Sequence, residues 1–210
     1  MRGDGTLCYD TGMDDDTGTH APTAPDTIVT ARLVLHPLTT ALARRIMTAA
    51  PDDPGPDGSV PDGSGPDGPW AQGYPTPADI AGARRFLEVS AQDGGQGPYG
   101  AYEIRRRDDG LAIGGAGFHG PADDEGTVTV GYGLVPAARG HGYARETLHA
   151  LLTHARNTGA RRVRGDTDLH NTASRRVMTA CGMRQIADDG RLAHYETTWH
   201  LTPAPATPQA

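Results

Sequence analysis

The residues with the clearest chemical potential lie at 139–144, Arg-Gly-His-Gly-Tyr-Ala, where a strand pattern gives way to a helix pattern. The glycines leave no side chains where the first unpaired N–H groups of that helix point outward, and the helix dipole adds partial positive charge. Gly142 allows close approach, Arg139 can add charge, and Ala144 keeps the first turn narrow. This segment, called the cradle below, is predicted to bind an anion such as a phosphate or a pyrophosphate.

Two other phosphate-binding motifs fit the cradle less well. A Walker loop requires Gly-Lys-Ser or Gly-Lys-Thr, and the chain contains no Lys. The dinucleotide fingerprint expects a third glycine where Arg145 stands, and only about 60 residues follow, too few for the remaining strands of that fold. Asp166 and Asp168 lie roughly 25 residues further on, which keeps a nucleotide-dependent oxidoreductase as an alternative.

Two glycines interrupt the strand pattern just before the cradle, in Val-Gly-Tyr-Gly-Leu-Val at 130–135. Gly131 and Gly133 weaken an otherwise good strand and favour a bulge or a close backbone approach. A strand that stops pairing here leaves free N–H and C=O groups beside the cradle. Phosphates at a helix start and amides along a strand edge together describe coenzyme A.

The elements that position these residues follow from hydrophobic periodicity and turn residues. Strands are predicted at 27–38, 99–107, 111–119, 127–135 and 160–168, with a final hairpin at 183–201, and helices at 39–50, 76–92, 141–157 and 171–182. Thr76 with Asp79, and Asn171 with Gly182, have the residue types of helix caps. The order predicts an α/β fold of the α+β type, a mixed, mainly antiparallel twisted sheet of about seven strands with about four helices.

The composition predicts one folded domain together with segments that do not contribute to its hydrophobic core. The chain has 210 residues, of which 29 are Gly and 17 are Pro. We expect a disordered acidic tail at 1–26, a folded domain at 27–202 and a disordered tail at 203–210. Within the domain, a segment rich in Pro-Asp-Gly at 51–69 is predicted to be a flexible insertion.

The charge and the cysteines exclude several classes of partner. The net charge is -7, and the two Asp-rich segments carry -5 each. The rest of the chain is therefore about +3, which suits a phosphorylated ligand at least as well as a basic one. All 19 basic residues are Arg and form no stripe, so nucleic acid is not expected. Cys8 and Cys181 favour neither a disulfide nor a metal site.

No segment has the pattern of a signal peptide, and no apolar run approaches the roughly 18 residues that span a bilayer. We therefore expect a cytoplasmic protein without a membrane partner.

Three motifs, taken in order, add a further indication. They are Thr-x-Arg-Leu-x-Leu at 30–35, GYGLVPAARGHGYARETL at 131–148, and NTASRRVMTACGM at 171–183. Together they resemble the GNAT N-acetyltransferase superfamily, and most closely its RimJ/RimL-like branch, over about Ile28 to Leu201. The superfamily signature Arg/Gln-x-x-Gly-x-Gly/Ala is matched by Arg139, Gly142 and Ala144.

The resemblance implies the acyl-CoA N-acyltransferase fold, with the sheet splayed between its fourth and fifth strands and acetyl-CoA bound there as co-substrate, without a metal. The backbone of Leu134 and Val135 would then bind the pantetheine. The pyrophosphate would lie on Arg139, Gly140, His141, Gly142, Tyr143 and Ala144. Asn171 would contact the cofactor, a role compatible with capping its helix.

Acetyl transfer to an amine needs a neutral nucleophile, oxyanion stabilisation and a proton for the leaving thiolate. Many relatives donate that proton from a Tyr at the position of Met178, which cannot donate. The RimJ/RimL-like branch implies Ser174 as the substitute, although a serine on the helix surface is an equal alternative.

The base is less defined, because relatives often carry a Glu where Thr129 stands. Glu103, His119 and Glu146 remain as candidates, each with a purely structural alternative as a strand, turn or first-turn residue. His119 is favoured, because the end of a strand before Gly-Pro should face a cleft and because its unperturbed pKa suits neutral pH.

The leading hypothesis is an acetyl-CoA-dependent N-acetyltransferase in which a primary amine, either a protein N-terminus or a small molecule, attacks directly in a ternary complex. Acceptor choice would rest with the segment that contains Trp70 and Tyr74. The alternative is a catalytically decayed acyl-CoA-binding sensor or interaction module, as Met178 and Thr129 allow. A homodimer is kept open.

Overall fold

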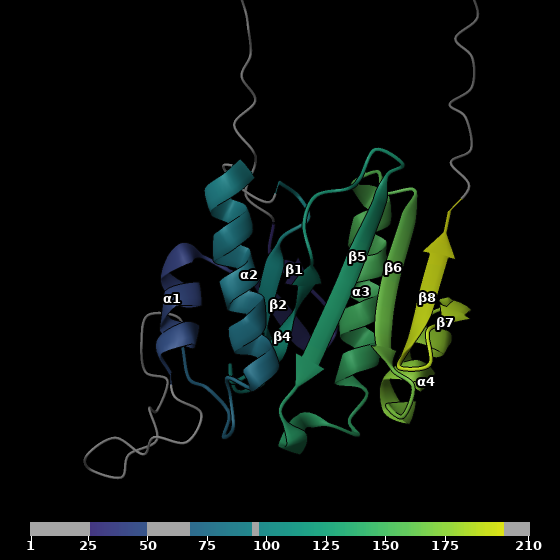
Figure 1. Cartoon of the computed structure of the whole chain (residues 1–210). Coiled ribbons are helices and arrows are strands. Elements are labelled where there is room, and N and C mark those ends of the chain that lie inside the picture. The colour runs from purple at the N-terminus through teal and green to yellow at the C-terminus, as the bar shows by residue number, and fades with distance from the viewer. Residues whose placement is uncertain (1–25, 50–67, 94–96, 200–210) are drawn as a thin grey trace, which may run out of the picture.

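The computed structural model of the chain describes residues 26–49, 68–93 and 97–199 (Figure 1). The predicted tails, apart from Asp26, and the predicted insertion, apart from its last two residues, lie outside this part of the chain. Within it, eight strands form one sheet in the order β1-β2-β3-β4-β5-β6-β8-β7.

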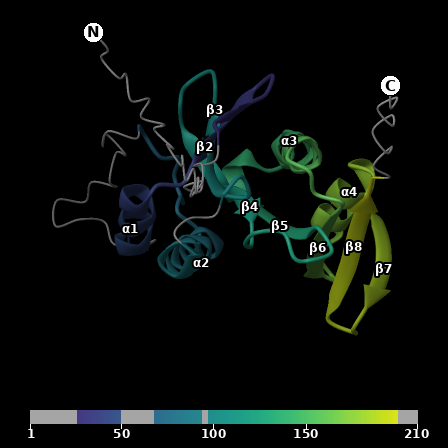
Figure 2. The same ribbon diagram turned by 90° about the horizontal axis from the view of Figure 1, so that it is seen from above.

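The strands are β1 (Ile28–Val29), β2 (Leu33–Pro37), β3 (Ala101–Arg106), β4 (Ala112–Phe118), β5 (Thr127–Leu134), β6 (Arg162–Asp168), β7 (Arg184–Asp188) and β8 (Leu192–Thr198). The helices are α1 (Thr40–Thr48), α2 (Pro77–Asp93), α3 (Tyr143–Asn157) and α4 (Thr172–Ala180), with a short 3-10 turn at Pro136–Ala138. Helices α1 and α2 cover one face of the sheet, and α3 and α4 lie on the other (Figures 1 and 2). The mixed, mainly antiparallel sheet and the four helices confirm the predicted fold class.

The segment predicted as one strand at 27–38 forms two short strands. Thr30 closes a turn between them, since its N–H donates to the Leu33 carbonyl at 2.9 Å and its Oγ1 accepts from the Leu33 N–H at 3.0 Å. This turn explains why the sheet has eight strands rather than about seven. The predicted fourth and fifth strands are therefore β5 and β6.

Strands β5 and β6 are parallel and pair only at one end. Thr127, Val128 and Thr129 pair with Arg162, Val163 and Arg164. Beyond these pairs, Gly131–Leu134 of β5 keeps its register with β4 but has none with β6. We call this unpaired region, between Gly131–Leu134 and Asp166–Asp168, the opening. It is the splayed sheet that was predicted between the fourth and fifth strands.

The hydrophobic core lies on both faces of the sheet. On one face, α3 buries Leu148, Leu151 and Ala155 completely. On the other, Ile46 of α1 and Phe86 of α2 are 2% and 8% exposed. No helix within the described residues is long and apolar enough to cross a membrane.

Capping residues fix the ends of the helices as predicted. Asn171 Oδ1 accepts from the Ser174 N–H at 3.1 Å, and Gly182 beyond α4 is left-handed, with φ 86°. At the start of α2, Asp79 Oδ2 accepts from the Thr76 N–H at 2.8 Å. These local bonds set where α4 and α2 begin, and so which residues face the opening and the sheet.

Candidate active site

The cradle enters α3 through an open backbone turn. Gly142 is the N-cap residue, in the left-handed region with φ 81°, and no side chain caps the helix. A Cβ added to Gly140 would meet nothing within 4 Å. The first turn of α3 thus has no side-chain cap and is preceded by an uncrowded glycine, which fits the binding of a pyrophosphate. The helix was predicted from 141 and starts at Tyr143 because Gly142 is left-handed.

The edge of β5 supplies further backbone groups. Thr129 and Val135 bond toward β4, since Thr129 O accepts from His119 N and Val135 N donates to Ile113 O, each at 2.9 Å. Backbone groups alternate in direction along such a strand, so those of Tyr132 and Leu134 face the opening. Of the two residues predicted to bind the pantetheine, Leu134 has its backbone N–H toward the opening, whereas the Val135 N–H is bonded to Ile113 O.

Arg139 reinforces the end of this edge. Its Nε donates to the Leu134 carbonyl at 3.1 Å, so the side chain turns back toward β5. The His141 ring stacks on the Tyr143 ring, with centroids 5.8 Å apart. Both contacts order the cradle around its two glycines.

Ser174 lies on the first turn of α4 and is paired with Tyr132 of β5. The two hydroxyl oxygens are 2.9 Å apart. Burial raises the pKa of Tyr132 although the bond to Ser174 lowers it, so the phenol keeps its proton at neutral pH. Sequence reasoning missed Tyr132, although its place between two glycines next to the cradle was an available signal. Met178, which replaces the usual Tyr, is 2% exposed and belongs to the core.

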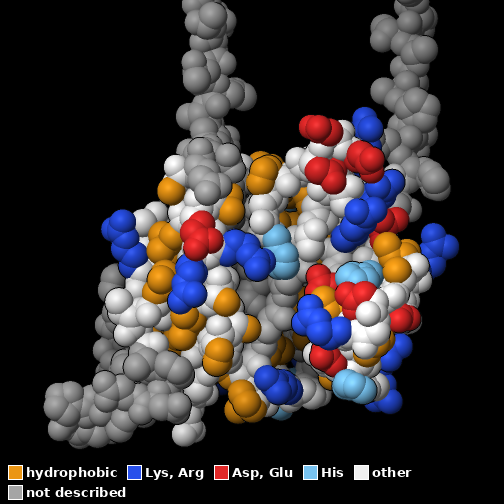
Figure 3. Space-filling view, viewed as in Figure 1, with side chains coloured by type: hydrophobic (Ala, Val, Ile, Leu, Met, Phe, Trp, Pro, Cys, Tyr) orange, Lys and Arg blue, Asp and Glu red, His pale blue; other side chains and the backbone are white. Residues whose placement is uncertain are grey.

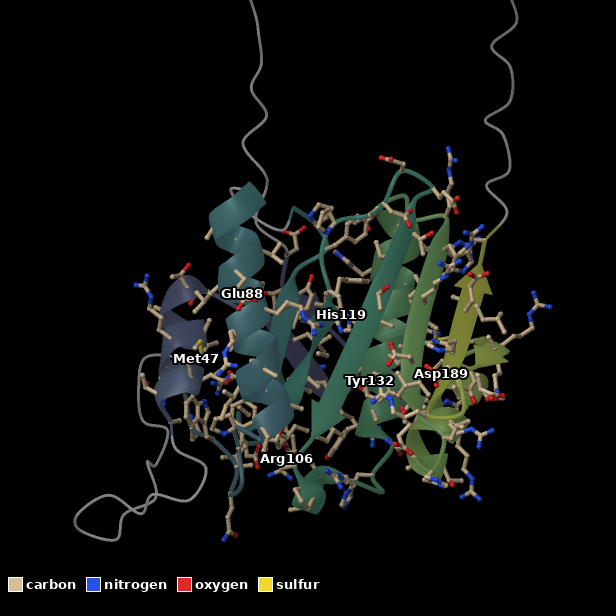
Figure 4. The ribbon with its side chains drawn as sticks, in the orientation of Figure 1. Met47, Glu88, Arg106, His119, Tyr132 and Asp189 are labelled. Carbon is tan, nitrogen blue, oxygen red and sulfur yellow. The ribbon has the colours of Figure 1, made fainter. Side chains whose placement is uncertain are left out.

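His119 lies on the opposite face of the opening, between α2 and β5 (Figure 4). A Cβ built on Gly131 would come within 2.7 Å of His119 Nε2, so the ring occupies the place that any other side chain at 131 would take. If the β5–β6 register were continued, Asp166 would stand opposite Gly131, on the same face as His119. Asp166 is near enough to act on the charge of the His119 imidazole, so the carboxylate of β6 and the imidazole lie on the same face at the opening.

The charge state of His119 is set by its surroundings. Partial loss of solvent lowers the pKa of its imidazole, the positive charge of Arg85 on α2 lowers it further, and Asp166 opposes both. The ring is therefore neutral near pH 7 and can accept a proton.

A cavity of about 330 Å³ adjoins His119, between α1, α2, β4 and β5. Its floor includes Gly115, Gly117, Gly131 and Gly133, and its walls include Leu38, Ile46, Tyr74, Phe86 and Arg85. On this side of the molecule, hydrophobic side chains gather over α1 and α2, and charged ones over β6 to β8 (Figure 3). The lining of the cavity is thus largely apolar, with Arg85 near His119 and Asp79 beside Gly115 as its charged residues.

Glu103 is not brought together with the other two predicted catalytic residues. It is 1% exposed on β3, where Trp70 Nε1 donates to its Oε1 at 3.0 Å and Arg105 Nη2 lies 2.5 Å from its Oε2. Burial raises the pKa of Glu103, and Arg105 partly offsets this. Glu103 is therefore a buried residue of a strand that is covered on both faces.

The structure does not test the expectation that the site works without a metal. Within the described residues, no group of three or more His, Cys, Asp or Glu side chains could hold a metal ion.

The fold and the opening define a class of protein that sequence comparison confirms. Residues 32–184 match the family model described as "Acetyltransferase (GNAT) domain". This match spans most of the chain, which therefore belongs to the GNAT acetyltransferase family and is an N-acetyltransferase of it. No curated protein sequence matches the chain.

Solved structures with the same fold include acetyltransferases of ribosomal proteins. RimL, a ribosomal L7/L12 alpha-N-protein acetyltransferase in complex with coenzyme A, has 17% identity and a TM-score of 0.56, with 82% of this chain and 98% of that chain covered. A putative ribosomal-protein-serine acetyltransferase from Vibrio cholerae has 16% identity and a TM-score of 0.55, with 84% and 99% covered. A putative GNAT-family acetyltransferase from Bordetella pertussis has 22% identity and a TM-score of 0.53, with 81% and 98% covered.

Proposed function

We propose that the protein transfers the acetyl group of acetyl-CoA to a primary amine by direct attack in a ternary complex, as an enzyme of the RimJ/RimL-like kind. The amine belongs to a protein N-terminus or to a small molecule. One observation carries the proposal: a backbone cradle, a neutral imidazole and a hydroxyl pair converge on the same opening.

The cofactor side of the opening uses the backbone. The cradle would hold the pyrophosphate, and the exposed edge of β5 at Tyr132 and Leu134 would hold the amides of the pantetheine. Acetyl-CoA supplies the activated acetyl group as a thioester. The N–H groups of the β5 edge are also placed to stabilise negative charge on the acetyl oxygen.

The acceptor side uses side chains. We propose that the acceptor places an apolar group in the cavity and its amine between His119 and Asp166. Asp166 attracts the ammonium form, and His119 accepts a proton from it, so that the nitrogen becomes a nucleophile. Arg85 lowers the pKa of the imidazole, which keeps the ring unprotonated before the step, and Asp166 raises that pKa and stabilises the imidazolium that forms.

The opposite face of the opening supplies the proton for the departing sulfur. When the bond from nitrogen to the acetyl carbon forms and the carbon–sulfur bond breaks, the nitrogen releases its second proton to water and Ser174 donates its hydroxyl proton to the sulfur. Ser174 takes a proton from Tyr132 through the contact at 2.9 Å, and Tyr132 is reprotonated from solvent, to which His119 also releases the proton it accepted. Because successive residues of β5 point to opposite faces, proton removal at Gly131 and proton donation at Tyr132 occur at separate places.

The test combines calorimetry with acetyl-CoA and an assay of thiol release over a panel of amines, including peptides with different N-terminal residues. We expect binding, and turnover with at least one amine, and we expect His119→Gln to bind acetyl-CoA like the wild type while losing turnover. Absence of binding at millimolar acetyl-CoA by the folded protein would end the proposal. Binding without thiol release from any amine would instead support the alternative, an acyl-CoA-binding sensor.

A further inference from the structure

The turn between β1 and β2 is bound to the first turns of α3 through Glu146. Thr30 Oγ1 donates to Glu146 Oε1 at 2.6 Å, and the Arg32 N–H donates to the same oxygen at 2.8 Å. Arg32 Nε donates to Oε2 at 2.8 Å, and its Nη2 lies 2.7 Å from Oε2. The carboxylate is thus held by one hydroxyl, one backbone amide and a guanidinium that uses two of its nitrogens.

The same arginine also contacts the cradle directly. Arg32 Nη1 donates to the carbonyl of His141 at 2.9 Å, and the guanidinium lies 4.8 Å from the centroid of the Tyr143 ring. Its Nη2 is 3.4 Å from where a Cβ on Gly142 would be. One side chain from the start of the domain therefore contacts His141 and Tyr143 of the cradle and lies beside Gly142 between them.

These contacts determine what Glu146 can do. Burial would raise the pKa of Glu146, but the bonds from Thr30 and Arg32 outweigh it and lower the pKa, so the group is a carboxylate at neutral pH. A carboxylate without a partner on the first turns of α3 would repel a diphosphate at the cradle. Arg32 offsets that charge and occupies the carboxylate, which removes Glu146 from the candidates for the base.

We propose that Arg32 is a positioning residue for the cofactor. By holding Glu146 and the carbonyl of His141, it keeps Gly140 and Gly142 in the open conformation that presents backbone N–H groups, and it offsets the one acidic side chain of the first turns of α3. The inference rests on the proposed function, because it takes the ligand of the cradle to be the diphosphate of acetyl-CoA.

The test compares Arg32→Gln with a matched control, Arg184→Gln, which removes an exposed arginine on the edge strand β7. Calorimetry gives the Kd of acetyl-CoA for each protein. We expect Arg32→Gln to raise this Kd by about tenfold or more, because it removes the bonds from the guanidinium to Glu146 and His141. We expect Arg184→Gln to leave the Kd unchanged. Equal Kd values for the two variants would overturn the proposal.

A second readout separates positioning from general damage. Acetyl-pantetheine carries the thioester without the diphosphate, so kcat/KM with this donor should be the same for Arg32→Gln and the wild type, while kcat/KM with acetyl-CoA falls through KM. In the ligand-free protein, the amide NMR signals of Gly140 and Gly142 should shift in Arg32→Gln and not in Arg184→Gln. Equal losses with both donors would show that Arg32 only supports the fold.

Two further variants keep the test decisive. Arg32→Lys retains the charge and the backbone N–H bond to Glu146 but lacks the guanidinium that binds Glu146 and His141 together, so we expect a Kd between those of the wild type and Arg32→Gln; a wild-type Kd would contradict the proposal. Adding Glu146→Gln to Arg32→Gln removes the uncompensated charge and should recover part of the affinity. If wild-type protein fails to bind acetyl-CoA, the proposed function fails, whereas binding that is insensitive to Arg32 overturns only this inference.

Discussion

The two sides of the opening between β5 and β6 differ in whether backbone groups or side chains would contact a ligand. On the cofactor side, apart from the hydroxyl pair of Ser174 and Tyr132, the groups offered to a ligand are backbone amides, and side chains such as Arg32 and Arg139 hold the backbone in place. On the acceptor side, the groups offered are side chains, His119 and the lining of the cavity, above a floor of glycines.

This difference indicates how each side can change. A backbone site depends on a conformation that only glycine adopts easily, so most substitutions there abolish it. In a site made of side chains, each single substitution alters the affinity or the rate by a limited amount. We therefore expect substitutions on the cofactor side to be severe for every acceptor, and those on the acceptor side to be graded.

The largest effect is expected from Gly142→Glu. The new side chain would start beside Arg32, whose Nη2 is 3.4 Å from the Cβ position; its carboxylate would take the charge that offsets Glu146 and add bulk and negative charge at the cradle, and we expect the Kd of acetyl-CoA to rise about 1000-fold, or about 4 kcal/mol. The control Gly142→Ala carries only the strain of a left-handed residue, about 1 kcal/mol. Calorimetry measures both, and an unchanged Kd for Gly142→Glu would mean that the cradle lies elsewhere.

Glu103→Gln should affect stability instead of chemistry. It leaves Arg105, which is 5% exposed, without a counter-charge, and we expect the free energy of unfolding to fall by about 3 kcal/mol. Urea unfolding measures this loss, while the Kd of acetyl-CoA and the pH profile of the folded enzyme should not change. Lost turnover at unchanged stability would instead assign Glu103 a catalytic role.

Ser174→Ala tests the proton donor. We expect kcat to fall about 100-fold, or about 2.7 kcal/mol, with an unchanged KM for acetyl-CoA. The helix cap is kept, because Asn171 accepts from the backbone N–H of residue 174 and not from its hydroxyl. If the two hydroxyls act as a unit, Tyr132→Phe and the double variant should lose no more than Ser174→Ala alone. If the losses of the two single variants add up in the double variant, the two hydroxyls act independently.

The smallest effects concern the pH dependence of the base. Because the pKa of His119 is lowered, activity should persist below the ordinary imidazole range and decline only as pH falls through that lowered pKa. Arg85→Gln removes a charge that lowers it and should move this decline to higher pH, whereas Asp166→Asn should move it to lower pH, each by about one unit or less. Profiles of kcat/KM against pH check the signs, and shifts in the same direction would exclude His119 as the base.

The parts of the site that the sequence predicts are those built from neighbours in the chain. The cradle occupies six consecutive positions, and the bond from Ser174 to Asn171 spans three residues. The pair Tyr132 and Ser174 spans 42 residues, and no local pattern indicates it. The turn at Thr30 was missed because apolar residues continue on both sides of it.

Glu103 shows why burial is harder to predict than strand formation. Its strand was recognised from local residue types, but the residues that cover both faces of β3 come from distant segments. Trp70 lies 33 positions away, and the alternation of side chains along a strand does not indicate whether the second face is covered. The burial of Glu103 and its pairing with Arg105 therefore could not be read from the sequence of the strand.

The contacts between Arg32 and Glu146 join residues 114 positions apart. Closing so long a segment loses much chain entropy, so these contacts should form late in folding, after the local hairpins. Tight binding of acetyl-CoA would then require that folding is complete. By thermodynamic linkage, bound acetyl-CoA should slow hydrogen exchange at the backbone amides of Arg32 and Leu33, which belong to a segment that the ligand need not touch.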